Sequence, residues 1–182
     1  MNFKIPFSGR SHEYNAKEIN LVSKIMKSKD NLTQGKYLIK FEKDFQDFLN
    51  NKQSKCYAVN SATSALELTA KLCNFKNNDE IIIPSHTYTS SAYPFLKEKV
   101  KIKWADIDFK KRVVTLDTIM NKFTNKTKAV VVVHLYGYAA QIDEIKKFCK
   151  QKKIILIEDV AQAIGTKLNK KMTGTFGDFA VF

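Results

Sequence analysis

Short apolar runs rich in valine and isoleucine recur along the chain after Asn50. Most of them do not alternate with polar residues, which is typical of strands buried on both faces of a sheet. We predict strands at residues 56–59, 81–83, 100–105, 129–133, 154–157 and 179–182. Helical spacing between several runs, as in Leu68 and Leu72, then predicts an α/β fold in which a mainly parallel sheet lies between two layers of helices.

The first fifty residues show helical spacing instead. Two helices are predicted, with apolar positions at Ile19, Val22, Ile25 and Met26 in the first and at Leu38, Phe41, Phe45, Phe48 and Leu49 in the second. No repeat, low-complexity tract or Pro/Gly/Ser linker interrupts the sequence. We therefore expect one domain over residues 1–182, with a helical segment at 1–50 and an α/β core at 51–182.

The carboxyl end reads as a turn at residues 173–178 followed by a strand of the buried type that ends with the chain at Phe182. Chains seldom stop inside a core strand. We expect this sequence to be the front part of a longer protein, and the alternative is an edge strand at a natural terminus.

Composition narrows the class of protein. Of the 182 residues 44% are hydrophobic, no apolar run is long enough to span a membrane, and the first ten residues lack a signal-peptide stretch. The three cysteines and three histidines show no paired spacing: Cys56, Cys73, Cys149, His12, His86 and His134. We expect a cytoplasmic protein with neither disulfides nor a metal, and no association with a membrane.

The net charge of +13 raises the possibility of nucleic-acid binding. Nearly all of the excess is lysine, since Arg10 and Arg112 are the only arginines, and the lysines are dispersed along the chain. Arginine binds bases and phosphates through two parallel hydrogen bonds, whereas dispersed lysines are more typical of a solvated surface. A nucleic-acid-binding module stays open as the less favoured alternative.

Ligands of an open parallel sheet bind beyond the carboxyl ends of its strands, so the residues after each run are candidates. Small polar residues at 60–64 open a helix, where Ser64 and Glu67 have capping-box spacing and free amides could bind a phosphate. An ordinary cap is the alternative. In the polar segment at 84–91, Tyr88 could cover a flat cofactor or pack on a helix.

Two further strands end in ionisable residues. His134 could act as a base, although a structural imidazole is more common. Glu158 and Asp159 end the run at 154–157, and strand alternation sends them to opposite faces. A buried carboxylate needs a positive partner, and a protonated heterocyclic nitrogen suits Asp159, with Gln162 nearby as a neutral hydrogen-bonding group.

Other common motifs are absent from the sequence. There is no Gly-x-Gly-x-x-Gly after the first predicted strand, no P-loop, and no Gly-x-Ser-x-Gly elbow. These absences disfavour a dinucleotide-binding Rossmann domain, a typical nucleotide triphosphatase and an α/β hydrolase.

Taken in order, the motifs resemble those of the pyridoxal-phosphate-dependent nucleotide-sugar aminotransferases of the DegT/DnrJ/StrS group, which have the aspartate aminotransferase fold (fold type I). The matching segments cover essentially the whole chain: residues 5–7, 32–35, 41–42, 60–66, 79–84 with 87–88, 133–137, 157–163 and 174–178. Departures are small, with Ala62 in place of a common glycine and Val160 in place of a frequent alanine.

The resemblance implies roles for five residues. Ala62 and Thr63 would bind the cofactor phosphate, and Tyr88 would stack on the pyridine ring. Asp159 would bond the ring nitrogen and Gln162 would lie near the phenolic oxygen. The implied fold is the three-layer αβα large domain of the fold-type-I transferases.

The resemblance also implies an activity: a homodimer would transfer an amino group from glutamate to a keto-sugar nucleotide. The product would enter amino-sugar and surface-polysaccharide synthesis. The family's Schiff-base lysine is expected beyond Phe182, so no catalytic residue is assigned here and the chain alone is expected to be inactive. A few members carry histidine at that position and act as sugar dehydratases. That activity and an inactive remnant are the remaining alternatives.

Overall fold

The computed structural model describes residues 13–31 and 33–182, and the chain divides into two compact units between Phe41 and Glu42. The motif at residues 5–7, together with Arg10, His12 and Leu32, lies outside the described residues. The single domain expected from the sequence remains a prediction.

The first unit contains α1 (Ala16–Lys27) and the beginning of α2 (Lys36–Leu49), so both predicted helices are confirmed. Asn15 caps α1 because its side-chain oxygen accepts hydrogen bonds from the amides of Lys17 and Glu18, while Glu18 accepts from the Asn15 amide. None of the residues of α1 is buried.

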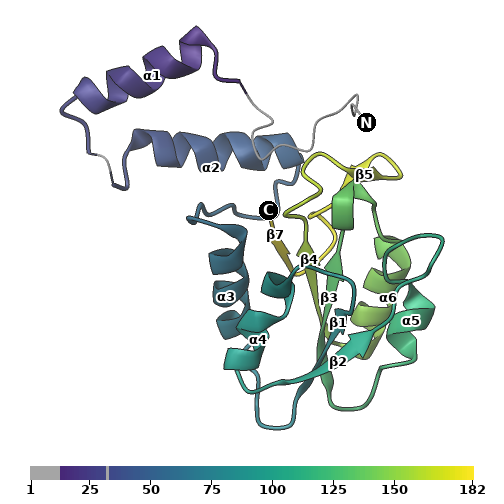
Figure 1. The fold of residues 1–182 in the computed structure, drawn as a ribbon. Helices are drawn as coiled ribbons and strands as arrows, with labels where there is room; N and C mark the ends of the chain where they lie inside the picture. The colour runs from purple at the N-terminus through teal and green to yellow at the C-terminus, as the bar shows by residue number, and fades with distance from the viewer. Residues whose placement is uncertain (1–12, 32) are drawn as a thin grey trace, which may run out of the picture. The chain divides into compact units, whose positions relative to one another are not determined.

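The second unit is built on a five-stranded parallel sheet in the order β2-β1-β3-β4-β7 (Figure 1). Its strands are β1 (Glu80–Pro84), β2 (Lys101–Ala105), β3 (Thr127–Val133), β4 (Ile155–Asp159) and β7 (Phe179–Val181). The helices are α3 (Ala62–Leu72), α4 (Tyr93–Lys97), α5 (Leu116–Met120) and α6 (Ile142–Lys152), with short 3-10 turns η1 (Thr89–Ser91) and η2 (Leu135–Gly137). The strands β5 (Lys167–Leu168) and β6 (Lys171–Met172) form a separate antiparallel hairpin.

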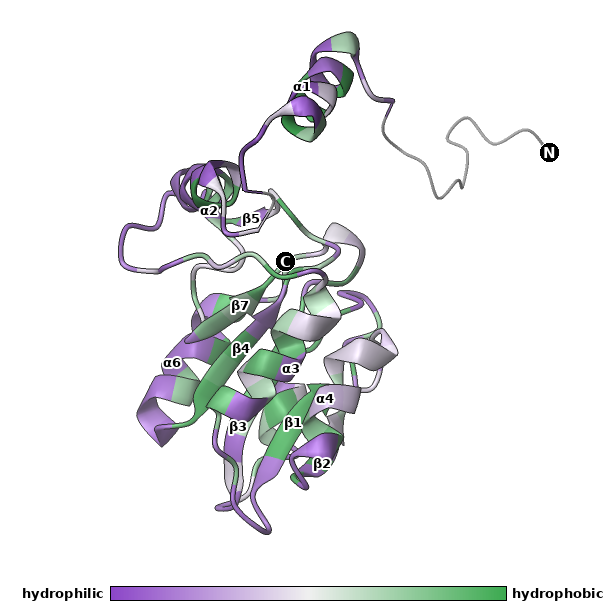
Figure 2. Cartoon of the chain, turned by 90° about the vertical axis from the view of Figure 1, so that its left-hand side faces the viewer, coloured by the Kyte–Doolittle hydropathy of each residue, from purple (hydrophilic) through white to green (hydrophobic). Residues whose placement is uncertain are grey.

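Alternate residues of each central strand enter different cores. Ile81 and Ile83 of β1 pack with α3 and α4, whereas Ile82 between them packs with α5 and α6. The same alternation runs through β3 and β4, which Figure 2 shows as largely hydrophobic between the helices. Burial on both faces explains the continuous apolar runs and confirms the three-layer αβα arrangement.

One predicted strand is wrong. Residues 56–59 belong to neither sheet, and Tyr57 is largely exposed. The amide of Ala58 donates to Glu42 Oε1 at 2.9 Å, so a side chain from α2 satisfies a backbone group that a neighbouring strand would otherwise have bonded. An apolar run four residues long does not by itself fix a strand partner.

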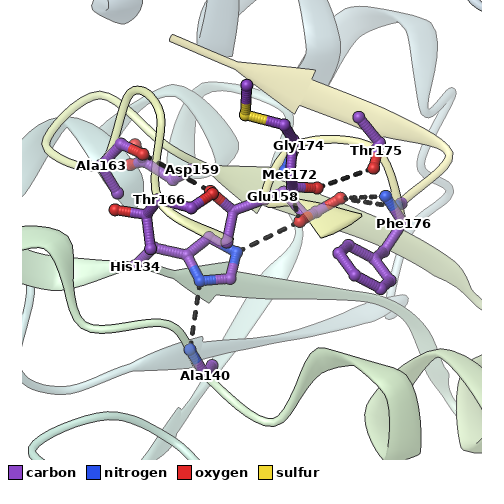
Figure 3. A network of polar contacts seen from close by, with 12 residues as sticks. His134, Ala140, Glu158, Asp159, Ala163, Thr166, Met172, Gly174, Thr175 and Phe176 are labelled. Atoms are coloured by element: carbon purple, nitrogen blue, oxygen red, sulfur yellow. Dashed lines mark hydrogen bonds and ion pairs between the residues drawn. The ribbon is translucent and has the colours of Figure 1, made fainter. Parts of the chain in front are cut away.

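A buried polar network joins the carboxyl ends of β3 and β4 to the loop at residues 174–177 (Figure 3). Its centre is the pair of His134 and Glu158, whose side chains are fully buried and whose Nε2 and Oε2 atoms lie 3.1 Å apart. The amide of Ala140 donates to His134 Nδ1 at 3.2 Å. Since Nδ1 accepts, the ring proton lies on Nε2 and is donated to Glu158, so His134 is a neutral structural imidazole.

The Glu158 carboxylate also accepts three backbone hydrogen bonds, from the amides of Gly174, Phe176 and Gly177 at 2.7, 2.7 and 2.6 Å. Burial opposes ionisation of this carboxyl group. Hydrogen bonds from His134, Gly174 and Gly177 outweigh the burial and hold the pKa of Glu158 below its ordinary value. The anion thereby fixes the loop against the end of the sheet.

Shortening a core side chain should destabilise the second unit. Ile82→Ala removes atoms that are almost fully buried between β1 and the α5 and α6 layer. We expect the free energy of unfolding to fall by about 2–5 kcal/mol. Ile164→Ala, at a side chain that is 58% exposed, should change it by less than about 1 kcal/mol. Denaturant titration of both variants measures the difference, and equal losses would contradict this assignment of the core.

Removing the Glu158 charge should make stability less dependent on pH. A glutamine offers one acceptor oxygen, and its NH2 group would face a backbone amide, so Glu158→Gln should cost about 2–4 kcal/mol at pH 7. Because the folded pKa lies below the ordinary value of 4.5, the stabilisation is present above that pH and is lost as the pH falls through the folded pKa.

The measurement is the free energy of unfolding of the parent chain and of Glu158→Gln between pH 3 and pH 7. The difference between them should shrink on acidification. Glu144→Gln, at an exposed position of α6, is the control and should track the parent. A difference for Glu158→Gln that stays constant over this range would show that the carboxylate charge is not responsible.

Candidate functional site

A cavity of about 180 Å³ lies where the carboxyl ends of β1, β3 and β4 meet. The connection from β1 runs to β2 and the connection from β3 runs to β4, in opposite directions across the sheet, which is where open parallel sheets form ligand crevices. The lining residues are Ala62, Thr63, Leu66, Thr87, Tyr88, Ser90, Ser91, Val133, Leu135, Asp159, Ala161 and Gln162. All five residues predicted for the site are therefore brought together.

The amino end of α3 forms one wall. Ser61 is the N-cap, and its side-chain oxygen accepts from the Ser64 amide at 3.1 Å. The capping box expected at Ser64 and Glu67 is therefore wrong, because the helix already begins before Ser64. The Glu67 carboxylate instead accepts a hydrogen bond from Lys97 Nζ at 2.6 Å. The amides of Ala62 and Thr63 have no acceptor among the described residues, as expected in the first turn of a helix.

Asp159 faces the cavity from the end of β4, on the face of the sheet opposite to Glu158. Its side chain is almost fully buried. Oδ2 accepts from the hydroxyl of Ser91 at 2.6 Å, and Oδ1 accepts from the amide of Ala161 at 3.1 Å. Since the single hydroxyl proton of Ser91 is directed to Asp159, the contact of 2.7 Å between Thr87 and Ser91 has Thr87 as its donor.

No cation pairs with this carboxylate within the described part of the chain. Its partners are two neutral donors, which leave lone pairs on both oxygens for a group in the cavity. A buried anion with neutral partners is stabilised further by a cationic donor. The chemistry of Asp159 therefore fits a protonated ring nitrogen.

Hydroxyl contacts join the other walls of the cavity. Thr63 Oγ1 donates to Ser90 Oγ at 2.9 Å, which ties the start of α3 to the loop after β1. In the same loop Tyr88 lines the cavity while 66% of its surface stays exposed, so its ring is available to a ligand. Gln162 Oε1 accepts from the Tyr136 amide at 3.2 Å, and Tyr136 has a left-handed backbone with φ of 54°.

Together these walls fit pyridoxal phosphate. The free amides of Ala62 and Thr63 at the positive end of an eleven-residue helix suit a phosphate, Asp159 suits the ring nitrogen, and Tyr88 offers an aromatic face. No lysine or histidine occurs among the residues lining this cavity.

Some residues of the site were not predicted. Ser91 and Thr87 complete the hydrogen-bond chain to Asp159, whereas the sequence indicates a ligand contact only for Tyr88 in the same polar segment. Their signal was a run of serine and threonine directly after a buried strand. His134, considered as a base, does not line the cavity.

The cysteines are free thiols and are poor nucleophiles. Burial, aided by the negative charge of Asp178, raises the pKa of Cys73 to about 11 and that of Cys149 to about 12. Within residues 13–31 and 33–182, no cluster of histidine, cysteine and carboxylate side chains could hold a metal ion. No helix in the same ranges is long and apolar enough to cross a membrane.

Two curated proteins similar to this chain are a GDP-perosamine synthase and a dehydratase named for a GDP-keto sugar. GDP-perosamine synthase of Vibrio cholerae is 36% identical over 150 residues, which cover 82% of this chain and 40% of that protein. The GDP-4-keto-6-deoxy-D-mannose 3-dehydratase of Yersinia pseudotuberculosis is 31% identical over 182 residues, covering 98% of this chain and 46% of that protein. The chain thus spans less than half the length of these relatives.

Solved structures of aminotransferases share the fold. An aminotransferase from Psychrobacter cryohalolentis has a TM-score of 0.88 and 26% identity, covering 96% of this chain and 44% of that one. A sugar aminotransferase described as putative, from Streptococcus pneumoniae in its PLP form, has a TM-score of 0.87 and 25% identity, covering 98% and 48%. These likenesses confirm the predicted α/β fold of the PLP-dependent transferases.

The model of the DegT/DnrJ/EryC1/StrS aminotransferase family matches residues 12–182, which is nearly the whole sequence. The match agrees with the order of motifs along the chain, and the motifs at residues 60–66, 87–88, 133–137 and 157–163 contribute side chains to one cavity. The chain belongs to the DegT/DnrJ/EryC1/StrS aminotransferase family.

Proposed function

We propose that this chain supplies the cofactor-binding part of a pyridoxal-phosphate-dependent aminotransferase that moves an amino group from glutamate to a keto-sugar nucleotide. The product would enter amino-sugar and surface-polysaccharide synthesis. The observation that carries the proposal is the buried Asp159 carboxylate, which faces the cavity shared with Thr63 and Tyr88 and has no cationic partner among the described residues.

Each wall of the cavity has a distinct task in this proposal. The amides of Ala62 and Thr63 bind the phosphate, and Tyr88 covers one face of the ring and excludes water from it. Asp159 accepts a hydrogen bond from the ring nitrogen and raises the pKa of that nitrogen, so that it stays protonated. Gln162 lies on the ring's oxygen side.

The bound cofactor supplies an electron sink as long as its ring nitrogen is protonated. Thr87 and Ser91 support that state indirectly. Their hydrogen bonds hold Asp159 Oδ2 in place, so the carboxylate keeps its orientation toward the cavity. We propose Ser91 as a positioning residue for Asp159.

Proton transfer at the substrate needs a further group, because no lysine or histidine lines the cavity. We propose that a lysine beyond Phe182 completes the site, so that this chain binds the cofactor without performing the reaction alone.

A second candidate reaction is the dehydration of a keto-sugar nucleotide. The similarity to the Yersinia pseudotuberculosis dehydratase favours it, since that match covers 98% of this chain. Histidine in place of the lysine would indicate this reaction. A complete enzyme incubated with glutamate and a keto-sugar nucleotide separates the two by mass spectrometry, because the aminotransferase product gains nitrogen and the dehydratase product loses a hydroxyl group.

We further propose that the complete protein is a cytoplasmic homodimer and that it does not bind nucleic acid. The cavity around Asp159 is small and contains an acidic residue but no lysine, arginine or histidine, which does not suit a nucleic acid.

Removing the charge of Asp159 should weaken cofactor binding. The probe is 4-deoxypyridoxine 5′-phosphate, which lacks the aldehyde and cannot react with surface lysines. A hydrogen bond to a charged partner contributes about 1.5–3 kcal/mol, so Asp159→Asn should raise the dissociation constant roughly 10- to 100-fold. A fluorescence titration of the full chain measures this constant.

Asp106→Asn is the matched control, because Asp106 also follows a strand of the sheet but does not line the cavity. It should bind the analogue as the parent chain does. If Asp159→Asn and Asp106→Asn bind equally well, Asp159 does not hold the ring and the proposed function fails.

The aromatic face of Tyr88 should matter more than its hydroxyl. Aromatic pairs contribute about 0.5–1.5 kcal/mol, so Tyr88→Ala should weaken analogue binding roughly 2- to 10-fold, whereas Tyr88→Phe should preserve it. Tyr57→Ala serves as the control at another exposed tyrosine. A loss in Tyr88→Phe equal to that in Tyr88→Ala would assign the effect to the hydroxyl and would contradict stacking.

A further inference from the structure

A second and larger cavity, of about 570 Å³, lies between the end of α2, the loop that follows it, α6 and the β5–β6 hairpin. It shares no lining residue with the cavity around Asp159. Its walls are formed by Phe48, Leu49, Asn50, Asn51, Gln53, Ser54, Lys146, Lys167, Asn169, Lys170, Lys171, Met172, Thr175 and Gly177. Of these lining residues, only Thr175 and Gly177 belong to the family motifs found in the sequence.

The charged residues that line this cavity are all basic. Four of its lining residues are lysines (Lys146, Lys167, Lys170 and Lys171), and none is an aspartate or glutamate. None of the four ammonium groups forms an ion pair with a described residue, and that of Lys171 lies 4.2 Å from the centre of the Phe176 ring. The nearby carboxylate of Asp143 accepts from Asn169 and is not part of the lining. Cations gathered in a concave surface attract anions from solution.

The hairpin presents its lysines from a defined backbone. Asn169 and Lys170 connect β5 to β6, and both have positive φ angles, of 49° and 66°, as a type I′ turn requires. Three lysines thus stand within five residues of a tight two-residue turn. Such a scaffold reduces the ordering cost of binding.

Neutral hydrogen-bonding groups complete the lining. Asn50, Gln53 and Asn169 provide amide donors around the lysines, whereas the hydroxyl of Thr175 already donates to the carbonyl oxygen of Met172 at 2.7 Å. The facing loop is internally ordered, since Asn51 Nδ2 donates to Ser54 Oγ at 2.8 Å and Asn51 Oδ1 accepts from the Gln53 amide at 3.2 Å. Lysines with several neutral donors suit an anion that carries many acceptor oxygens and more than one charge.

We propose that this second cavity is a binding site for a small phosphate-bearing anion with two linked phosphates, of the pyrophosphate type. Four lysines offset more charge than a carboxylate or a single phosphate carries, and the cavity has room for more than one phosphate group. The compact lysine ammonium groups bind phosphate oxygens as point charges. The site is separate from the proposed cofactor cavity and does not depend on the proposed function.

Calorimetric titration of the full chain with inorganic pyrophosphate at fixed ionic strength tests the site. Pyrophosphate should bind more tightly than phosphate, and acetate should show no binding. Lys170→Ala/Lys171→Ala should weaken pyrophosphate binding by roughly fivefold or more. Lys110→Ala/Lys111→Ala, an adjacent lysine pair in a turn outside the cavity, should bind as the parent chain does.

Lys146 and Lys147 form a second matched comparison on α6, because only Lys146 lines the cavity. Lys146→Ala should weaken pyrophosphate binding, and Lys147→Ala should not. Asp159→Asn should leave it unchanged, which separates this site from the cofactor cavity. Equal losses of pyrophosphate affinity in the matched variants would overturn the proposal, because they would indicate diffuse surface charge. The same conclusion would follow if a single-stranded oligonucleotide bound more tightly than pyrophosphate and lost affinity equally in all of these lysine variants.

Discussion

A strand buried on both faces has no water to solvate a charge, and β4 ends in two adjacent carboxylates. Alternation along the strand separates them, so that Glu158 enters the α6 side of the sheet and Asp159 enters the α3 side. Each must then find its own compensation. Glu158 finds it within the chain, whereas Asp159 has only neutral donors among the described residues.

This division links the structure of the sheet edge to its chemistry. Glu158 holds the loop at residues 174–177 by backbone amides, and the backbone of Asp159 accepts from the amide of His134, so the ends of β3 and β4 are fixed together. The Asp159 side chain is then presented from a rigid strand end. For the role that we propose for Asp159, such a support sets the orientation of the carboxylate before a ligand arrives.

The central strands, and the place of five candidate residues at one edge of the sheet, could be predicted because their signals are local. Valine and isoleucine runs mark β3 and β4, and polar residues directly after them mark the ligand edge. The same type of run at residues 56–59 predicts a strand that is not present, because whether a run finds a strand partner depends on the whole fold. The helix α4 was missed because five residues, with Pro94 in the first turn, give no helical period to detect.

The hydrogen-bond partner of Ser91 could not be predicted from sequence. Ser91 lies 68 positions from Asp159 in sequence, and only the pairing of β1 with β3 and of β3 with β4 brings its hydroxyl to the carboxylate. Serine and threonine are common after strands for many reasons, so the sequence around Ser91 does not identify its partner.

The loop that Glu158 holds is bonded through amide groups, which every residue except proline possesses, so these hydrogen bonds by themselves make no demand on its side chains. Packing constrains Phe176, whose ring is buried in the core. The two glycines of the loop are constrained by the space around their backbone. At Gly177 a Cβ atom would lie 2.7 Å from the carbonyl oxygen of Leu156, and at Gly174, where φ is 84°, it would overlap the ring of Phe182. Substitutions at these two glycines should therefore be poorly tolerated, because a side chain at either position would displace the backbone whose amides bind the Glu158 carboxylate.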